Sequence, residues 1–295
     1  MRAIGGRLAD LLRGGLIGAA EVVPGVSGGT IALITGVYDT LIGSAATLIR
    51  ALVGSFRSEG RGARWQAVAE IPWWRLVVIL VGMGSAIVLA AGILEPLIER
   101  FPEHSRAIFL GLILASIAIP LRMAGGVRSA GAIALVGVSA AFTFVLTGLP
   151  PSSLQSPSEL VIALAAAVAV CALVLPGVSG SFLLLSIGLY QPTIEAVNER
   201  DLAYLGVFAL GALVGLGSFV VVLQWLLAHH HRVTLLVMAG LMAGSTRALW
   251  PWQTEERVLL APGDNVLALI GLVVVGAAIV FGLMRWERSL TSAEH

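Results

Sequence analysis

The sequence predicts an all-α polytopic membrane protein built from two inverted-topology repeats. Three observations lead to this fold class. The chain of 295 residues is 58% hydrophobic and only 12% charged, which is more apolar surface than a soluble domain can bury. Six apolar segments are long enough to span a membrane, and one fifteen-residue pattern occurs twice inside apolar sequence.

The N-terminal segment, MRAIGGRLADLLRGG, is basic and amphipathic. A cleavable signal peptide has instead a charged tip followed by an apolar core. We therefore expect no signal peptide here. The segment is predicted to form a helix that lies at the membrane surface.

Two regions, residues 11–50 and 159–197, each hold a Pro-Gly break near the middle. Residues 24–38 read PGVSGGTIALITGVY and residues 176–190 read PGVSGSFLLLSIGLY, so eight of fifteen positions match at an offset of 152. Pro cannot continue a helix, and Gly permits backbone angles that other residues resist. Each region is therefore predicted to be a re-entrant-type helical hairpin whose two halves meet at the break. Whether each half crosses fully is left open.

The remaining apolar segments are predicted to be transmembrane helices, because a helix needs roughly 20 residues to cross. They are residues 73–95, 106–121, 129–148, 203–228, 232–249 and 265–284. Each half thus holds one hairpin and three spans, with repeat 1 in residues 1–150 and repeat 2 in residues 151–295. Since three is odd, the second hairpin enters from the opposite side, as in the inverted repeats of many transporters.

Arginine placement predicts that both termini are cytoplasmic. Under the positive-inside rule, cytoplasmic loops carry the excess of basic residues. The loop after the first hairpin contains several arginines, whereas the loop 149–158 contains none. The later cytoplasmic loops hold Arg122 and Arg128, then Arg232, then Arg285.

Small polar residues at the two breaks are candidates for binding an anion. Ser27 is a good N-cap for the half-helix that follows, which leaves the amides of Gly28, Gly29 and Thr30 unpaired in the break. A helix N-terminus with free N–H groups suits a phosphate. The same logic applies to Ser179, Gly180 and Ser181. The alternative is that Pro-Gly and small residues simply allow a kink and tight helix crossing.

Glu21 is an ionisable residue inside an apolar segment, three residues before Pro24. Such residues are costly in a membrane and usually serve a pathway. Glu21 is a candidate proton carrier or a partner for an arginine; the alternative is a position at the water interface. The matching position in the second hairpin is Leu173, so the acid is asymmetric.

Five further side chains are candidate ligand contacts. Arg106, Arg122 and Arg247 lie near the ends of predicted spans, and guanidinium groups bind phosphate in a bidentate manner. Arginines at such places also snorkel to lipid phosphates without a specific role. Tyr38 and Tyr190 follow the breaks at the same spacing, where each would donate to a ligand or anchor a hairpin end.

Several classes of function are excluded or disfavoured. A single cysteine, Cys171, rules out an intrachain disulfide and a cysteine-based metal site. Three successive histidines, His229 to His231, cannot all face one way on a helix, and the sequence has no HExxH, CxxC or GxSxG motif. We therefore expect no metal and no cofactor. A net charge of +1 implies no attraction to nucleic acid.

The segments EVVPGVSGGTIALITGVYDTLI and VLPGVSGSFLLLSIGLYQPTI resemble the bacterial polyprenyl-phosphate transporter family, formerly a domain of unknown function. The resemblance extends from about residue 10 to 285. It implies a flippase, not an enzyme, that returns undecaprenyl phosphate across the inner membrane for cell-wall biogenesis. Its implied partners are the polyprenyl-phosphate lipid and membrane lipids, with a homodimer left open.

The resemblance also assigns site residues. The first signature is matched by Pro24, Gly25, Ser27, Gly28, Gly29 and Thr30, and the second by Pro176, Gly177, Ser179, Gly180 and Ser181. The family commonly has an acid shortly before the first signature, usually Asp, and Glu21 keeps that charge here. Facing hairpin tips would hold the phosphate while the tail stays in lipid, and Glu21 would bind a driving proton.

Three rival functions remain at this stage. A membrane polyprenyl-pyrophosphate phosphatase also has inverted hairpins, but the arginine and the glutamate pair of its motif are missing here. A secondary transporter of a small soluble anion would share the architecture. A purely structural subunit would leave the duplicated break unexplained.

Overall fold

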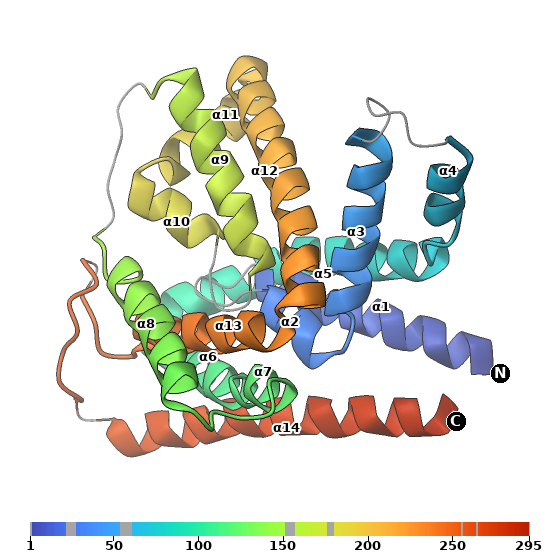
Figure 1. Cartoon of the computed structure of the whole chain (residues 1–295). Helices are drawn as coiled ribbons and strands as arrows, with labels where there is room; N and C mark the ends of the chain where they lie inside the picture. Colours follow the sequence, from blue (N-terminus) through green and yellow to red (C-terminus); the bar gives the residue numbers. More distant parts are fainter. Residues whose placement is uncertain are drawn as a thin grey trace.

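The computed structural model describes residues 2–21, 28–53, 61–150, 157–175, 180–254, 256–263 and 265–294. Within these residues every element longer than an isolated β-bridge is helical, as predicted (Figure 1). Helices long and apolar enough to cross a membrane cover Pro102–Met123, Leu202–His229 and Val266–Arg285. Shorter apolar helices are Trp73–Leu89, Ala130–Leu146 and Glu159–Val174. The prediction of an all-helical membrane protein is confirmed.

The first half contains eight helices among the described residues. They are α1 (Arg2–Glu21), α2 (Gly28–Ile34), α3 (Tyr38–Val53), α4 (Arg61–Ala69), α5 (Trp73–Arg100), α6 (Pro102–Ser116), α7 (Ala118–Met123) and α8 (Ala130–Leu146). The second half contains α9 (Glu159–Val174), α10 (Gly180–Ile187), α11 (Tyr190–Glu199), α12 (Leu202–His229), α13 (His231–Ser245), the 3₁₀ helix η2 (Thr246–Leu249) and α14 (Val266–Glu294).

Helix lengths repeat between the halves. Helices α5 and α12 both have 28 residues, and α6 and α13 both have 15 residues. After α6 and after α13, the chain continues directly into a short helix, α7 or η2. In Figure 1 the α9–α12 pair is steeply inclined to the α1–α5 pair. The orientation of the halves in a membrane stays a prediction.

Glycines allow four close helix pairs, α1 with α5, α9 with α12, α6 with α14 and α8 with α13. A Cβ atom at Gly82 or Gly211 would overlap the backbone of the partner in the first two pairs. The same holds for Gly111 against α14 and Gly240 against α8. Small residues at these positions let backbones approach closely, which is how helices associate in lipid. In two of the pairs, a helix of one half packs on a helix of the other.

The hairpins are more broken than predicted. The expected return arm is split by a bend of 116° between α2 and α3. Gly36 lies at this bend with φ of 68°, and Gly188 lies at the matching bend with φ of 88°. Both glycines belong to the repeated Gly-x-Tyr unit, and Gly adopts this left-handed region at little cost. The prediction of two halves meeting at one break is therefore wrong for these return arms.

The N-terminal segment also differs from the prediction. It forms one continuous helix, α1, with the first arm of the hairpin, instead of a separate surface helix. Contacts with α5 explain this continuity, because Gly14 and Gly18 both face the α5 backbone closely. Helix α4 was not predicted; Trp65 on it is 69% exposed.

Candidate functional site

The first candidate site is the contact between Glu21 and Gly28, on the two sides of the first break. Glu21 is the last residue of α1, and Gly28 is the first residue of α2. The Gly28 amide donates a hydrogen bond of 2.9 Å to Oε1 of Glu21. A carboxylate that accepts from a helix N-terminus is favourably placed, because the first amides of a helix lack intrahelical partners.

This contact changes one prediction. The amide of Gly28 was expected to be unpaired, but the protein's own carboxylate occupies it. A Cβ atom at position 28 would overlap the Glu21 carboxylate, so a larger residue there would displace the carboxylate from this contact. The carboxylate therefore lies where an oxygen of a bound anion was expected.

The surroundings of this contact are apolar and buried. Thr30 is only 1% exposed, and Ala20 and Ile31 belong to the central core cluster. Val174 and Leu175, which directly precede the second Pro-Gly, pack against the same cluster. Residues that flank the two breaks thus share one core.

The second hairpin repeats the backbone without the acid. Gly180 begins α10, as Gly28 begins α2. A Cβ atom at Gly180 would overlap the carbonyl oxygen of Ala169 and touch the Cβ atom of Leu173. The glycine here serves helix packing on α9 and approaches no carboxylate. Ser181 is the second residue of α10.

The two tyrosines of the repeated Gly-x-Tyr units have different environments. Tyr38 is 4% exposed, and its hydroxyl donates a 3.1 Å hydrogen bond to the carbonyl oxygen of Val174. This bond joins the first hairpin to the end of α9. Tyr190 is partly buried against a separate cluster with Leu189, and its hydroxyl has no hydrogen-bond partner in the described part of the chain.

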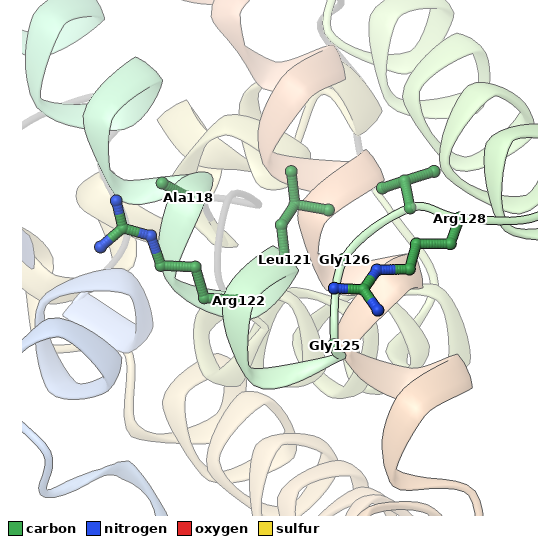
Figure 2. A pocket seen from close by; sticks show the side chains of 7 residues that line it. Ala118, Leu121, Arg122, Gly125, Gly126 and Arg128 are labelled. Carbon is green, nitrogen blue, oxygen red and sulfur yellow. The ribbon is translucent and has the colours of Figure 1, made fainter.

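The predicted arginines lie at two ends of the α6–α7 span. Arg106 on α6 donates to the carbonyl oxygen of Pro251. Arg247 on η2 donates to the backbone carbonyl oxygens of Phe144 and Arg257. These two arginines therefore lie near the segment that follows α13. Arg122 lies at the other end, on α7, beside a cavity (Figure 2). The structure does not bring the three together.

Arg257 is a buried charge in the loop that the sequence predicts between the last two spans. Its side chain donates to the carbonyl oxygen of Leu149 at 2.7 Å and to Oγ of Ser186 on α10 at 2.9 Å. Burial lowers the pKa of this guanidinium, although an arginine remains charged at neutral pH. Arg257 thus links the loop before α14 to the second hairpin. The sequence carries no local signal for this contact.

A second missed group joins α1 to α5. Asp10 pairs with Arg13 at 2.6 Å and with Arg75 at 3.2 Å. Arg13 is 7% exposed, and a buried charge needs such a partner. The i, i+3 spacing of Asp10 and Arg13 could be recognised in the sequence as a possible ion pair. Nothing in the sequence indicates the contact of Asp10 with Arg75.

Several predicted site residues lie outside the described residues. They are Pro24, Gly25, Ser27, Pro176, Gly177 and Ser179, and their assignments stay predictions. Across the described ranges, no group of three or more His, Cys, Asp or Glu residues is placed to hold a metal ion. Among the described residues, the breaks therefore hold the Glu21 carboxylate, the Gly28 amide that donates to it, and the buried Tyr38 hydroxyl that donates to Val174.

Comparisons with known proteins agree on one family. The model of the undecaprenyl phosphate translocase-like family matches residues 17–267. A polyprenyl-phosphate transporter of Vibrio cholerae serotype O1 is 37% identical over 303 aligned positions, which cover 95% of this chain and 96% of that protein. No solved structure matches the chain. The chain therefore belongs to the undecaprenyl phosphate translocase-like family.

Proposed function

We propose that this protein translocates a polyprenyl phosphate, with undecaprenyl phosphate as the natural cargo, across the bacterial inner membrane. The head group passes between the two broken hairpins while the prenyl tail remains in lipid. Family membership and the similarity to the Vibrio cholerae transporter support the substrate class. The contact between Glu21 and the Gly28 amide carries the mechanism, because it pairs a carboxylate with a backbone donor in an apolar core.

In this mechanism the Glu21 carboxylate and the cargo phosphate compete for one donor. When Glu21 is ionised, it holds the Gly28 amide as the structure describes. When a proton neutralises Glu21, its hydrogen bond to the amide weakens, since ionised acceptors bind amides more strongly than neutral ones. A phosphate oxygen then replaces the carboxylate. Proton binding and cargo binding are thereby coupled at one atom.

Alternating access follows from the duplicated architecture. In inverted repeats, two states arise when the halves exchange conformations around a site near the bilayer midplane. The repeated helix lengths support the duplication. The shared core between residues flanking both breaks supports a common site. No bond of the cargo is made or broken in this mechanism.

The direct test is translocation of a fluorescent polyprenyl phosphate in proteoliposomes that contain the purified protein. Wild type is expected to transfer the lipid between leaflets, and Ser27→Ala and Ser179→Ala are expected to slow the transfer. Transfer no faster than in protein-free vesicles would overturn the proposal. Unchanged rates in both serine variants would remove the break residues from the mechanism.

Two parallel measurements separate the rival functions. Release of inorganic phosphate from polyprenyl pyrophosphate would indicate a phosphatase. Uptake of labelled soluble phosphate, without lipid transfer, would indicate a small-anion transporter. The proposal requires lipid transfer without phosphate release.

A further inference from the structure

A cavity of about 480 Å³ lies at the end of α7, where the chain turns into α8. Its wall combines apolar side chains with arginines. Ala118, Leu121 and Val127 contribute the apolar part, and Arg122 and Arg128 contribute the charge. Figure 2 shows the two guanidinium groups on different sides of Leu121. The cavity shares no lining residue with the hairpin breaks.

The turn that forms one wall is fixed by its own hydrogen bonds. Gly126 donates to the carbonyl oxygen of Leu121 at 2.8 Å, and Gly125 donates to that of Arg122 at 3.0 Å. Both glycines have positive φ angles, 77° and 83°. Together with the two hydrogen bonds, these angles form the Schellman motif that commonly ends a helix. Arg232 of α13 also donates to the carbonyl oxygen of Ala124 at 3.2 Å. The wall is therefore preformed, which lowers the cost of binding.

The charge of the cavity is not neutralised by the protein. Arg122 and Arg128 are exposed, and in the described part of the chain their side chains have no hydrogen-bond or ion-pair partner. No acidic residue lines the cavity. Free guanidinium groups bind phosphate oxygens through paired N–H donors. The cavity therefore favours an anion.

The position of the cavity favours an anionic lipid over a soluble anion as its ligand. Arg122 is at the end of the apolar stretch Pro102–Met123, which is long enough to cross the membrane. The end of such a span lies at the level of lipid head groups, where basic pockets between helices bind anionic lipids. The apolar wall beside the arginines can contact the first part of a hydrocarbon chain. A soluble anion would use the arginines and leave that wall unused.

We propose that this cavity is a peripheral docking site for the phosphate group of an anionic lipid. Arg122 and Arg128 contact the phosphate oxygens from different sides, and Leu121 and Val127 contact the chain. The inference rests on the proposed function only where the lipid is taken to be the transported polyprenyl phosphate. In that case the cargo binds here after it leaves the hairpins, since the loop with Arg122 and Arg128 is predicted to be cytoplasmic.

The test counts lipids bound to the purified full-length protein by native mass spectrometry. The probe is farnesyl phosphate, and the variant is Arg122→Gln with Arg128→Gln. The variant is expected to lose one bound lipid, or to bind it about 25-fold more weakly, given roughly fivefold for each of the two arginines near a membrane surface. The matched control is Arg285→Gln, an exposed arginine outside the cavity. Equal lipid binding in wild type and double variant would overturn the proposal.

Competition identifies the source of the phosphate. Phosphatidylglycerol that displaces the farnesyl phosphate supports a site for anionic lipids in general, and failure to displace it supports a site for the cargo. Inorganic phosphate that displaces the lipid equally well would overturn lipid docking. The double variant Arg122→Lys with Arg128→Lys keeps the charge and is expected to retain partial binding. Failure of lipid transfer by wild type, with this binding intact, would refute the proposed function and leave the docking site standing.

Discussion

The first broken hairpin carries a carboxylate at its break, whereas the second carries a leucine at the matching position. Glu21 accepts a hydrogen bond from Gly28, and Leu173 lies against Gly180. The short helices also differ in their surroundings. Helix α2 contacts α1, α3, α6, α9 and α14, whereas α10 packs mainly on α9 and α11 and accepts a hydrogen bond from Arg257 in a loop.

In the described residues, the two hairpins therefore resemble each other in their helices and differ in their chemistry. Both hairpins have a Pro-Gly sequence, a short helix and a left-handed glycine. The first hairpin adds a charge that can take up a proton. The second adds a contact with the loop before α14. The two hairpins therefore have unequal roles in the proposed cycle, and four pairs of variants test this inequality.

The largest expected effect is that of Glu21→Gln. Removing an intramembrane carboxylate from a coupled site is expected to slow lipid transfer by about tenfold or more, as for a functional charge in a transport pathway. The pH dependence of transfer is expected to disappear, because the amide side chain does not titrate. Transfer in proteoliposomes at several pH values measures both effects. Leu173→Gln is the matched control in the second hairpin. An equal loss of lipid transfer in this variant would contradict the unequal roles of the two hairpins.

Gly28→Ala is expected to act through Glu21. The added methyl group overlaps the end of the flexible Glu21 side chain, which can move away, so the loss of stability is expected to be smaller than the ~1–3 kcal/mol typical of an overpacked core. Unfolding of the purified protein in detergent measures this loss. Adding Glu21→Ala to the Gly28→Ala variant is expected to restore part of the lost stability, because the effects of substitutions at contacting residues are not additive.

Gly180→Ala provides the matched case in the other hairpin. Its methyl group meets the carbonyl oxygen of Ala169, so Glu21→Ala is expected to give no recovery. Recovery in both hairpins would show that Glu21 acts on general stability instead of on its own break.

Arg257→Gln is expected to loosen the second hairpin. The change removes the guanidinium that donates to Ser186 and Leu149, and a hydrogen bond to a charged group contributes about 1.5–3 kcal/mol net to stability. Hydrogen exchange is expected to rise in α10 and to stay unchanged in α2. The exposed neighbour Glu256 supplies the control variant Glu256→Gln. Faster exchange confined to α2 would contradict the assignment.

The smallest expected effect is a difference in stability between variants of the two tyrosines. Tyr38→Phe removes the hydrogen bond to Val174 and is expected to cost about 1 kcal/mol of stability. Tyr190→Phe is expected to change stability much less, because its hydroxyl has no partner in the described residues. Thermal unfolding of both variants under one condition gives the difference. Equal losses would show that the tyrosines have equivalent structural roles.

The sequence by itself determined the helical fold class and the positions of most of the long helices. The predicted span 203–228 agrees with α12, Leu202–His229, and the span 129–148 agrees with α8, Ala130–Leu146. The length of an apolar segment and the positions of Pro and Gly are local properties of the sequence, so they can be recognised without knowing the fold. The bends at Gly36 and Gly188 carried a signal in the repeated Gly-x-Tyr unit, which the prediction did not use.

Only the tertiary structure decided which groups meet. The sequence singled out Glu21 as costly but gave no reason to pair it with the Gly28 amide. It likewise gave no reason to join Tyr38 to Val174, 136 positions away, or Arg257 to Ser186. These partners depend on how distant helices pack, and close helix packing depends on the glycines that face each backbone. Local chemistry can therefore specify a helix and its breaks, whereas the binding partners of a charge at a break depend on the packing of the whole chain.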